Sequence, residues 1–185
     1  MEIKKIFHAP VIQEELDTLK IGDMVYLQGS IFTARDAAHK RMYQLIKEGK
    51  PLPIELKDQV IYYAGPCPAR PGLMIGSCGP TTSSRMDAYT PLLLEHGLKA
   101  MIGKGPRSAQ VIEAMVKYGA VYLAAVGGAG ALIASCIKKV EIVAFEDLGP
   151  EAIYRMEVEN MPLLVAIDAQ GNNLYEMGPL QFARI

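Results

Sequence analysis

Residues 99–145 read KAMIGKGPRSAQVIEAMVKYGAVYLAAVGGAGALIASCIKKVEIVAF, and the predicted architecture starts from this stretch. A helix begins after Ser108, whose side chain suits an N-cap, and ends at Gly119. A second, shorter helix is predicted at Ala131–Ile137. Three short apolar runs read as strands: Lys99–Ile102, Val121–Val126 and Val140–Phe145. Strands that alternate with helices predict an α/β fold, here a mixed sheet with flanking helices.

The same alternation continues on both sides of this stretch. Upstream, residues 24–33 read as one strand that bends or bulges near Gly29, because glycine weakens the interior of a strand. A helix follows, with Asp36 as its predicted cap and Gly49 at its end, and Val60–Ala64 is the next predicted strand. Downstream, two further strands are predicted: Ala152–Val158 and Leu163–Asp168.

Residues 65–80 hold four prolines and four glycines, a composition that predicts a loop with a fixed path rather than a flexible linker. After this loop, Ser84 and Asp87 have the spacing of a capping box. They predict a helix that ends before Gly97 and that Pro91 either kinks or restarts.

Length and charge predict a single domain that binds no nucleic acid and does not span a membrane. A chain of 185 residues is expected to form a single domain, residues 1–185. Lysine and arginine number 19 against 20 acidic residues, a net charge of −1, so we expect no nucleic-acid partner. Residues 118–137 carry no charge, but their glycines favour a strand, a turn and a helix over a membrane span.

The cysteines indicate neither a disulfide framework nor a metal site. Cys67, Cys78 and Cys136 are odd in number and lack the C-x-x-C spacing of common zinc sites. Residues 1–8 contain no apolar run of the length found in signal peptides. We therefore expect a cytoplasmic protein with free thiols and no metal ligands of its own.

A glycine-rich turn at residues 126–133 joins a predicted strand to a predicted helix, as in dinucleotide-binding folds. Its Gly128-x-Gly130-x-x-Ile133 spacing lacks the third glycine of that fingerprint. Close packing of strand on helix is the favoured interpretation, with nucleotide binding, or an anion held at the helix N-terminus, as alternatives.

Three predicted strand-to-helix corners combine a cation with free backbone amides. Arg35 precedes the Asp36 cap, Thr81 to Arg85 form a hydroxyl-rich corner, and Lys104 lies between two glycines. Helix N-termini attract anions, and arginine binds carboxylates with two parallel hydrogen bonds, so we expect a site for a small polyanion such as a dicarboxylate. His39, on the polar face of the helix after Arg35, is expected to be solvated.

Four segments of the sequence resemble those of a known protein family. The segments are Thr33–Arg41 (TARDAAHKR), Gly79–Asp87 (GPTTSSRMD), Ile102–Gly105 (IGKG) and Glu146–Ala152 (EDLGPEA). Together they resemble the β subunit of class I (iron–sulfur) fumarate hydratase, which also occurs as the C-terminal domain of single-chain enzymes. They are similar as well to the β subunit of L(+)-tartrate dehydratase.

The resemblance implies a swivelling β/β/α domain and a set of site residues. Arg35, Arg85 and Lys104 match residues that bind the substrate carboxylates, and Thr81 matches the proposed catalytic base. The resemblance also implies a [4Fe–4S] cluster that the partner α subunit ligates and that this chain does not, with an open iron acting as a Lewis acid.

The implied function is that of a β subunit of a hydro-lyase that reversibly hydrates fumarate to L-malate and is active only with its α subunit. A hetero-oligomer, such as α2β2, is expected. One alternative is the same chemistry on L(+)-tartrate, which gives oxaloacetate. The other is a different class of protein, a non-catalytic module that binds a dicarboxylate.

Overall fold

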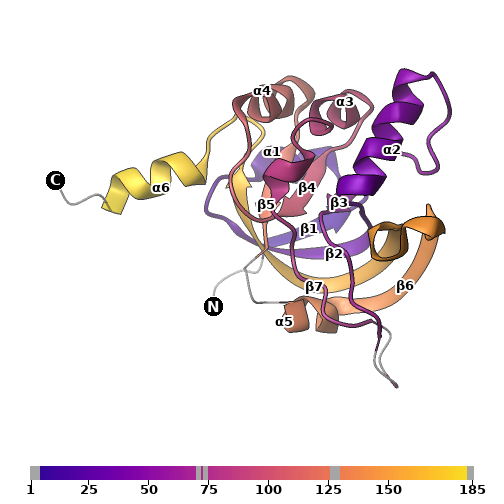
Figure 1. The fold of residues 1–185 in the computed structure, drawn as a ribbon. Coiled ribbons are helices and arrows are strands. Elements are labelled where there is room, and N and C mark those ends of the chain that lie inside the picture. Colours follow the sequence, from indigo (N-terminus) through magenta and orange to yellow (C-terminus); the bar gives the residue numbers. More distant parts are fainter. Residues whose placement is uncertain (1–4, 70–71, 73–74, 126–129, 183–185) are drawn as a thin grey trace.

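The structure, a computed structural model, describes residues 5–69, 72, 75–125 and 130–182 (Figure 1). Within these ranges the chain has a mixed α/β fold. The strands are β1 (Lys5–Ala9), β2 (Met24–Thr33), β3 (Val60–Tyr62), β4 (Ala100–Gly103), β5 (Val121–Ala124), β6 (Ile137–Ala144) and β7 (Ile153–Ile167). The α-helices are α1 (Gln13–Thr18), α2 (Asp36–Lys47), α3 (Thr90–Glu95), α4 (Ala109–Tyr118), α5 (Gly130–Cys136) and α6 (Leu174–Phe182). Two 3₁₀ helices complete the set, η1 (Ser83–Met86) and η2 (Glu146–Glu151).

The sheet closes into a barrel, which the alternation of elements did not predict. Its strand order is β1-β2-β3-β4-β5-β7-β6, and an additional pairing of β2 with β7 joins β2, β3, β4, β5 and β7 in a ring. The pairs from β1 to β5 are parallel, and β7 is antiparallel to β2, β5 and β6. The predicted mixed sheet with flanking helices is confirmed.

Strand β7 corrects the prediction of two separate strands at Ala152–Val158 and Leu163–Asp168. It is one strand of 15 residues, and it pairs with β2 from one end of β2 to the other. Asn160 takes a left-handed conformation with φ 52°, which asparagine tolerates better than most residues, so the chain bends there and continues. The facing strand β2 shifts register between Leu27 and Gly29, which confirms the bulge predicted near Gly29.

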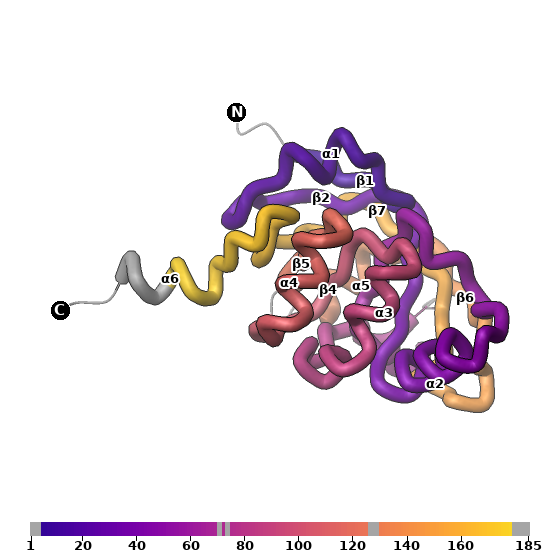
Figure 2. The backbone as a smooth tube through the Cα atoms, turned by 90° about the horizontal axis from the view of Figure 1, so that it is seen from above, coloured from indigo at the N-terminus to yellow at the C-terminus, as the bar shows by residue number. Residues whose placement is uncertain are grey.

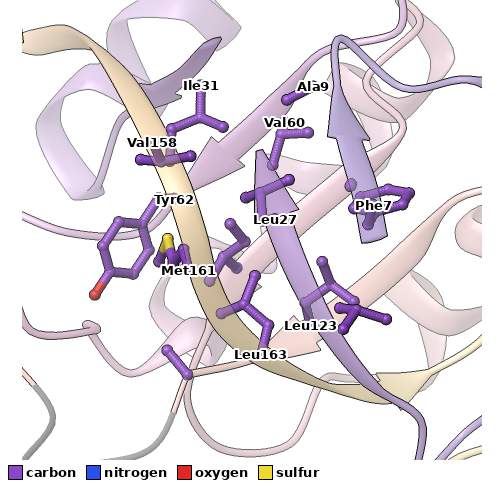
Figure 3. Packing of buried hydrophobic residues seen from close by; sticks show 14 of the residues in the cluster. Phe7, Ala9, Leu27, Ile31, Val60, Tyr62, Leu123, Val158, Met161 and Leu163 are labelled. Atoms are coloured by element: carbon purple, nitrogen blue, oxygen red, sulfur yellow. The ribbon is translucent and has the colours of Figure 1, made fainter. Parts of the chain in front are cut away.

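Strands β3, β4 and β5 of the barrel are buried on both faces, apart from the partly exposed last residue of β5, whereas β2 and β7 alternate between buried and more exposed residues. In β4, for example, Ala100 and Ile102 belong to the cluster that fills the barrel, whereas Met101 belongs to the cluster under the helices. Figure 3 shows part of the first cluster, with Leu27 of β2 beside Val60 of β3 and Leu163 of β7. Burial on both faces explains why β3, β4 and β5 read as continuous apolar runs rather than as alternating patterns.

The helix starts differ from two predictions. Asp36 is the first residue of α2 rather than its cap, and Arg35 occupies the N-cap position. The segment after the loop does not begin with a capping box at Ser84 and Asp87, because it forms the short η1 and then restarts as α3, with Pro91 in its first turn. Proline lacks the amide hydrogen that the first turn of a helix leaves unpaired, so this restart is favoured.

Four elements had no counterpart in the sequence prediction. They are β1, α1, η2 and α6, which are short or only weakly periodic. Figures 1 and 2 both show α6 extending away from the rest of the fold. The uncharged stretch 118–137 contributes the end of α4, β5 and α5, and no helix in the described ranges has the length and apolar character to cross a bilayer.

The parallel strands place three loops at one end of the barrel. Strands β2, β3 and β4 run in the same direction, so their carboxyl ends, at Thr33, Tyr62 and Gly103, lie at the same rim. Such rims are where α/β folds form their binding sites. The predicted site residues lie in the loops after β2 and β4, in the segment that leads into η1, and in η1 itself.

Candidate functional site

Backbone hydrogen bonds bring Thr81 and Lys104 side by side at this rim. The Thr81 amide donates to the Tyr63 carbonyl at 2.6 Å, and the Lys104 amide donates to the Thr81 carbonyl at 3.4 Å. The Ser83 amide then donates to the Lys104 carbonyl at 2.9 Å, and Thr82 and Lys104 form a parallel bridge. Two of the three predicted corners therefore form one short piece of sheet beyond β3 and β4.

The third corner joins them through Asp36. Its Oδ1 accepts a hydrogen bond from Arg85 Nε at 2.6 Å, and its Oδ2 accepts one from Arg35 Nε at 3.2 Å. Burial by itself raises the pKa of Asp36, but its own backbone amide and the two arginines outweigh burial and hold that pKa below its usual range. Asp36 is thus a carboxylate that links two cations from different elements.

A second carboxylate and a glycine fix the other side of Arg35. Glu151 of η2 lies 3.2 Å from Arg35 Nη2 and accepts a hydrogen bond from the Ala37 amide at 2.8 Å. A Cβ at Gly65 would lie 3.0 Å from Arg35 Nη1 and 2.8 Å from the Pro150 carbonyl oxygen. The absence of a side chain at position 65 therefore lets Arg35 lie against the backbone.

Two polar groups at the rim are unpaired. Across the described part of the chain, neither the Thr81 hydroxyl nor the Lys104 ammonium has a hydrogen-bond or ion-pair partner. The terminal nitrogens of Arg85 are also available, because its only described ion pair uses Nε and half of the side chain is exposed. Cations outnumber carboxylates in this group, so the rim suits an anionic ligand.

A buried ion pair between Arg107 and Asp87 stabilises the segments that form the rim. Arg107, whose side chain is fully buried, donates from Nε to Asp87 Oδ1 at 2.7 Å and from Nη2 to Thr90 Oγ1 at 2.9 Å. Its guanidinium also lies over the rings of Tyr63 and Tyr122, at 5.3 and 5.2 Å. Asp87 is therefore structural, since it anchors the Thr81–Arg85 corner to the segment that follows Lys104.

His39 corrects the expectation of a solvated histidine. It is completely buried, its Nδ1 lies 3.2 Å from the Arg35 carbonyl, and its ring packs edge-on against Tyr63 at 5.1 Å. Its Nε2 has no hydrogen-bond partner among the described residues. Loss of hydration is the main reason that the pKa of His39 is lowered to about 4, so the ring is neutral at physiological pH.

This burial predicts acid sensitivity. The pKa of His39 rises from about 4 in the fold to its ordinary 6.5 on unfolding, so the unfolded chain binds the proton more readily. The stability is complete above pH 6.5 and is lost as the pH falls toward 4, by about 2–3 kcal/mol. Urea unfolding between pH 7.5 and 4.5 measures this loss.

His39→Phe should flatten that pH dependence, because an apolar ring of similar shape does not titrate. His96→Gln is the matched control, since His96 is exposed and its removal should leave the slope unchanged. If stability falls with pH equally steeply in His39→Phe and in the unmodified chain, His39 is not the cause of the acid sensitivity.

The cysteines are not placed as ligands for an iron–sulfur cluster. Cys67 is exposed, whereas Cys78 and Cys136 are buried. Burial, and to a lesser degree the Cys67 thiol, raises the pKa of Cys78 to about 12, so this thiol is protonated at neutral pH. Within the described ranges, no group of three or more His, Cys, Asp or Glu side chains could hold a metal ion.

The predicted glycine-rich turn lies largely outside the described residues, which omit 126–129. Gly130, the first residue of α5, is described, and a Cβ there would collide with Ser77 Oγ and approach the Gly79 amide nitrogen at 3.2 Å. This close approach favours the packing interpretation at Gly130 over a nucleotide site.

The fold and the rim together define a class of mixed α/β domain, a closed barrel whose rim carries two arginines, a lysine and a threonine. A family model described as fumarase C-terminus matches residues 2–178, and the chain belongs to that family. The resemblance found in the Gly79–Asp87 and Ile102–Gly105 motifs is thereby confirmed.

Individual relatives agree with this assignment. The chain is 44% identical over 169 residues to fumarate hydratase 1, mitochondrial, of Leishmania major, covering 90% of this chain and 31% of that protein. It is 42% identical over 167 residues to the anaerobic class I fumarate hydratase of Escherichia coli, covering 89% of this chain and 30% of that protein. It thus spans about three tenths of the length of these fumarate hydratases.

A third relative is matched along most of its length. The chain is 41% identical over 170 residues to the putative L(+)-tartrate dehydratase subunit beta of Methanocaldococcus jannaschii, covering 89% of this chain and 87% of that protein. The chain is therefore a β-type domain of the fumarate hydratase and tartrate dehydratase family.

The sequence predicted four site residues, which lie at one rim of the structure, but gave no indication of the groups that hold the two arginines. Asp36 was assigned to a helix cap, Glu151 lay in a matching segment without a role, and Gly65 was only part of a loop. The one available signal was the adjacency of Arg35 and Asp36, since an arginine beside an acid at a helix start often forms an ion pair.

Proposed function

We propose that this chain is the β subunit of a class I hydro-lyase and that it binds the dicarboxylate while fumarate is hydrated to L-malate. The observation that carries the proposal is the convergence of Arg35, Arg85, Lys104 and Thr81 at one rim. A relative named as a β subunit supports an α-subunit partner. In this proposal the α subunit ligates the [4Fe–4S] cluster, since the described cysteines of this chain are not placed to do so.

In the proposed mechanism, Arg35, Arg85 and Lys104 bind the two carboxylates and fix the orientation of the substrate. In the dehydration direction, the Thr81 oxygen, as an alkoxide, accepts the proton from the carbon next to a carboxylate, and the C–H electron pair moves into that carboxylate. The pair then forms the C=C bond as the C–O bond on the neighbouring carbon breaks, and the departing hydroxide leaves as water with a proton equivalent to the one that Thr81 accepted. The nearby cations stabilise both the threonine alkoxide and the aci-carboxylate that develops. In the hydration direction the same oxygen returns the proton to carbon.

L(+)-tartrate is the second candidate substrate, and the match along 87% of a putative tartrate dehydratase β subunit favours it. L-malate, the hydrated form of fumarate, and L(+)-tartrate are both dicarboxylates that lose water across a C–C bond, so the same cations serve either one. Rates for fumarate and L(+)-tartrate, measured side by side with the assembled enzyme, distinguish the two.

The isolated chain is expected to show no hydratase activity, even after anaerobic treatment with iron and sulfide. The same chain combined with its α subunit should turn over. Activity of the isolated chain would contradict the proposed division of labour. If the assembled complex binds a dicarboxylate but turns over neither substrate, the alternative of a non-catalytic binding module replaces the proposal.

A further inference from the structure

We infer that Asp36 is a positioning residue, which holds Arg35 and Arg85 by their Nε atoms and leaves Nη1 of Arg35 and both terminal nitrogens of Arg85 for the substrate. The inference rests on the proposed function, in which both arginines bind a carboxylate. Asp36 itself would not touch the substrate and would act only through the two arginines.

Each oxygen of the Asp36 carboxylate contacts a different arginine. Oδ1 serves Arg85 at 2.6 Å and Oδ2 serves Arg35 at 3.2 Å, so each oxygen has one guanidinium. A guanidinium is a rigid planar fork, and a hydrogen bond at Nε therefore restricts the plane and direction of the whole group. Asp36 can thus orient both forks at once.

The arginines need such a link because they come from separate parts of the fold. Arg35 precedes α2, and Arg85 belongs to η1, 49 positions after Asp36 in the chain. Two guanidinium groups brought together without a carboxylate between them repel each other. Asp36 is well fixed for this task, since it starts the 12-residue helix α2 and its side chain is only 29% exposed.

Glu151 adds to the constraint on one side only. It lies 3.2 Å from Arg35 Nη2, which leaves Nη1 as the terminal nitrogen of Arg35 without an ion pair in the described structure. Arg85 retains both terminal nitrogens. Among the residues that the structure describes, Arg85 is thus held by Asp36 alone, and loss of Asp36 should affect Arg85 more than Arg35.

The test compares Asp36→Asn with Asp147→Asn in the assembled enzyme. Asp147 is a matched control, because it also pairs with an arginine, Arg41, at 2.8 Å through both oxygens, but on the exposed surface. We expect Asp36→Asn to lower kcat/KM by about tenfold or more, mainly through KM, the loss typical of one charged hydrogen bond. Asp147→Asn should change it by less than about twofold.

A double-mutant cycle with Arg85→Ala separates positioning from a general structural effect. If Asp36 acts through Arg85, Asp36→Asn should change kcat/KM much less in the Arg85→Ala background than in the unmodified enzyme. Asp36→Glu, which retains the charge, should recover part of the activity. Equal effects in both backgrounds, or a loss that only follows a lowered melting temperature, would overturn the inference.

The cycle also distinguishes a failure of the proposed function from a failure of the inference about Asp36. If Arg85→Ala leaves kcat/KM unchanged, the proposed function of the rim is wrong and the inference falls with it. If Arg85→Ala is strongly impaired while Asp36→Asn behaves like Asp147→Asn, the proposed function stands and the inference alone is overturned.

Discussion

Arg85→Lys is expected to lower kcat/KM of the assembled enzyme roughly 30- to 900-fold. This fold-change corresponds to a loss of transition-state stabilisation on the order of 2–4 kcal/mol. Arg85 uses Nε for Asp36 and keeps its terminal nitrogens free. Lysine has a single nitrogen, so it cannot hold Asp36 and bind a substrate carboxylate with two parallel hydrogen bonds at the same time. Steady-state kinetics with fumarate and with L(+)-tartrate measure the loss.

Arg41→Lys is the control for this substitution. Arg41 pairs with Asp147 outside the rim, and its side chain is 37% exposed compared with 50% for Arg85. The control should retain nearly full activity. A change below about threefold in Arg85→Lys, well under the value of one charged hydrogen bond, would mean that Arg85 does not bind the substrate.

Thr81→Ala is expected to lower kcat by about 10²- to 10⁴-fold while the affinity for substrate stays nearly the same, because a proposed base acts in the transition state. The described backbone bonds of Thr81, to Tyr63 and Lys104, do not involve its side chain. The melting temperature should therefore change little, as for an ordinary surface substitution. Thr81→Ser should keep more activity than Thr81→Ala, since it retains the hydroxyl.

Thr82→Ala is the matched control, one residue along the same corner. Thr82 is the N-cap residue of η1 but makes no side-chain capping hydrogen bond, so its loss should be mild in both kcat and stability. Normal kcat in Thr81→Ala together with a lowered melting temperature would assign Thr81 a structural role instead of a catalytic one.

The local elements were largely predictable because their signals are local. The helix at residues 109–118, with Ser108 before it and Gly119 in a left-handed conformation after it, agrees with its sequence signals. The strands at 100–103 and 121–124 agree with their apolar runs. The single strand β7 was missed, because Asn160 and Pro162 look like a break when the long facing strand β2 is not considered.

The approach of the site residues could be anticipated in part. Three predicted strand-to-helix corners, each with a cation, were expected to form a site for a small polyanion, but the sequence did not indicate which strands pair in parallel and bring the corners to one rim. The burial of His39 was not predicted, because Lys40 and Arg41 follow it and it was placed on the polar face of its helix. Its burial follows from the packing of α2 over Tyr63 of the loop after β3.

Amino-acid order alone therefore established the α/β class, the family, and Arg35, Thr81, Arg85 and Lys104 as site candidates, since periodicity, glycines and motifs are properties of neighbouring residues. Tertiary structure alone showed the pairing of β2 with β7 that closes the barrel, and the carboxylates of Asp36 and Glu151 on the arginines. The reason is physical: a strand pairing or an ion pair joins residues far apart in the chain, and its energy depends on distances that only the folded backbone sets.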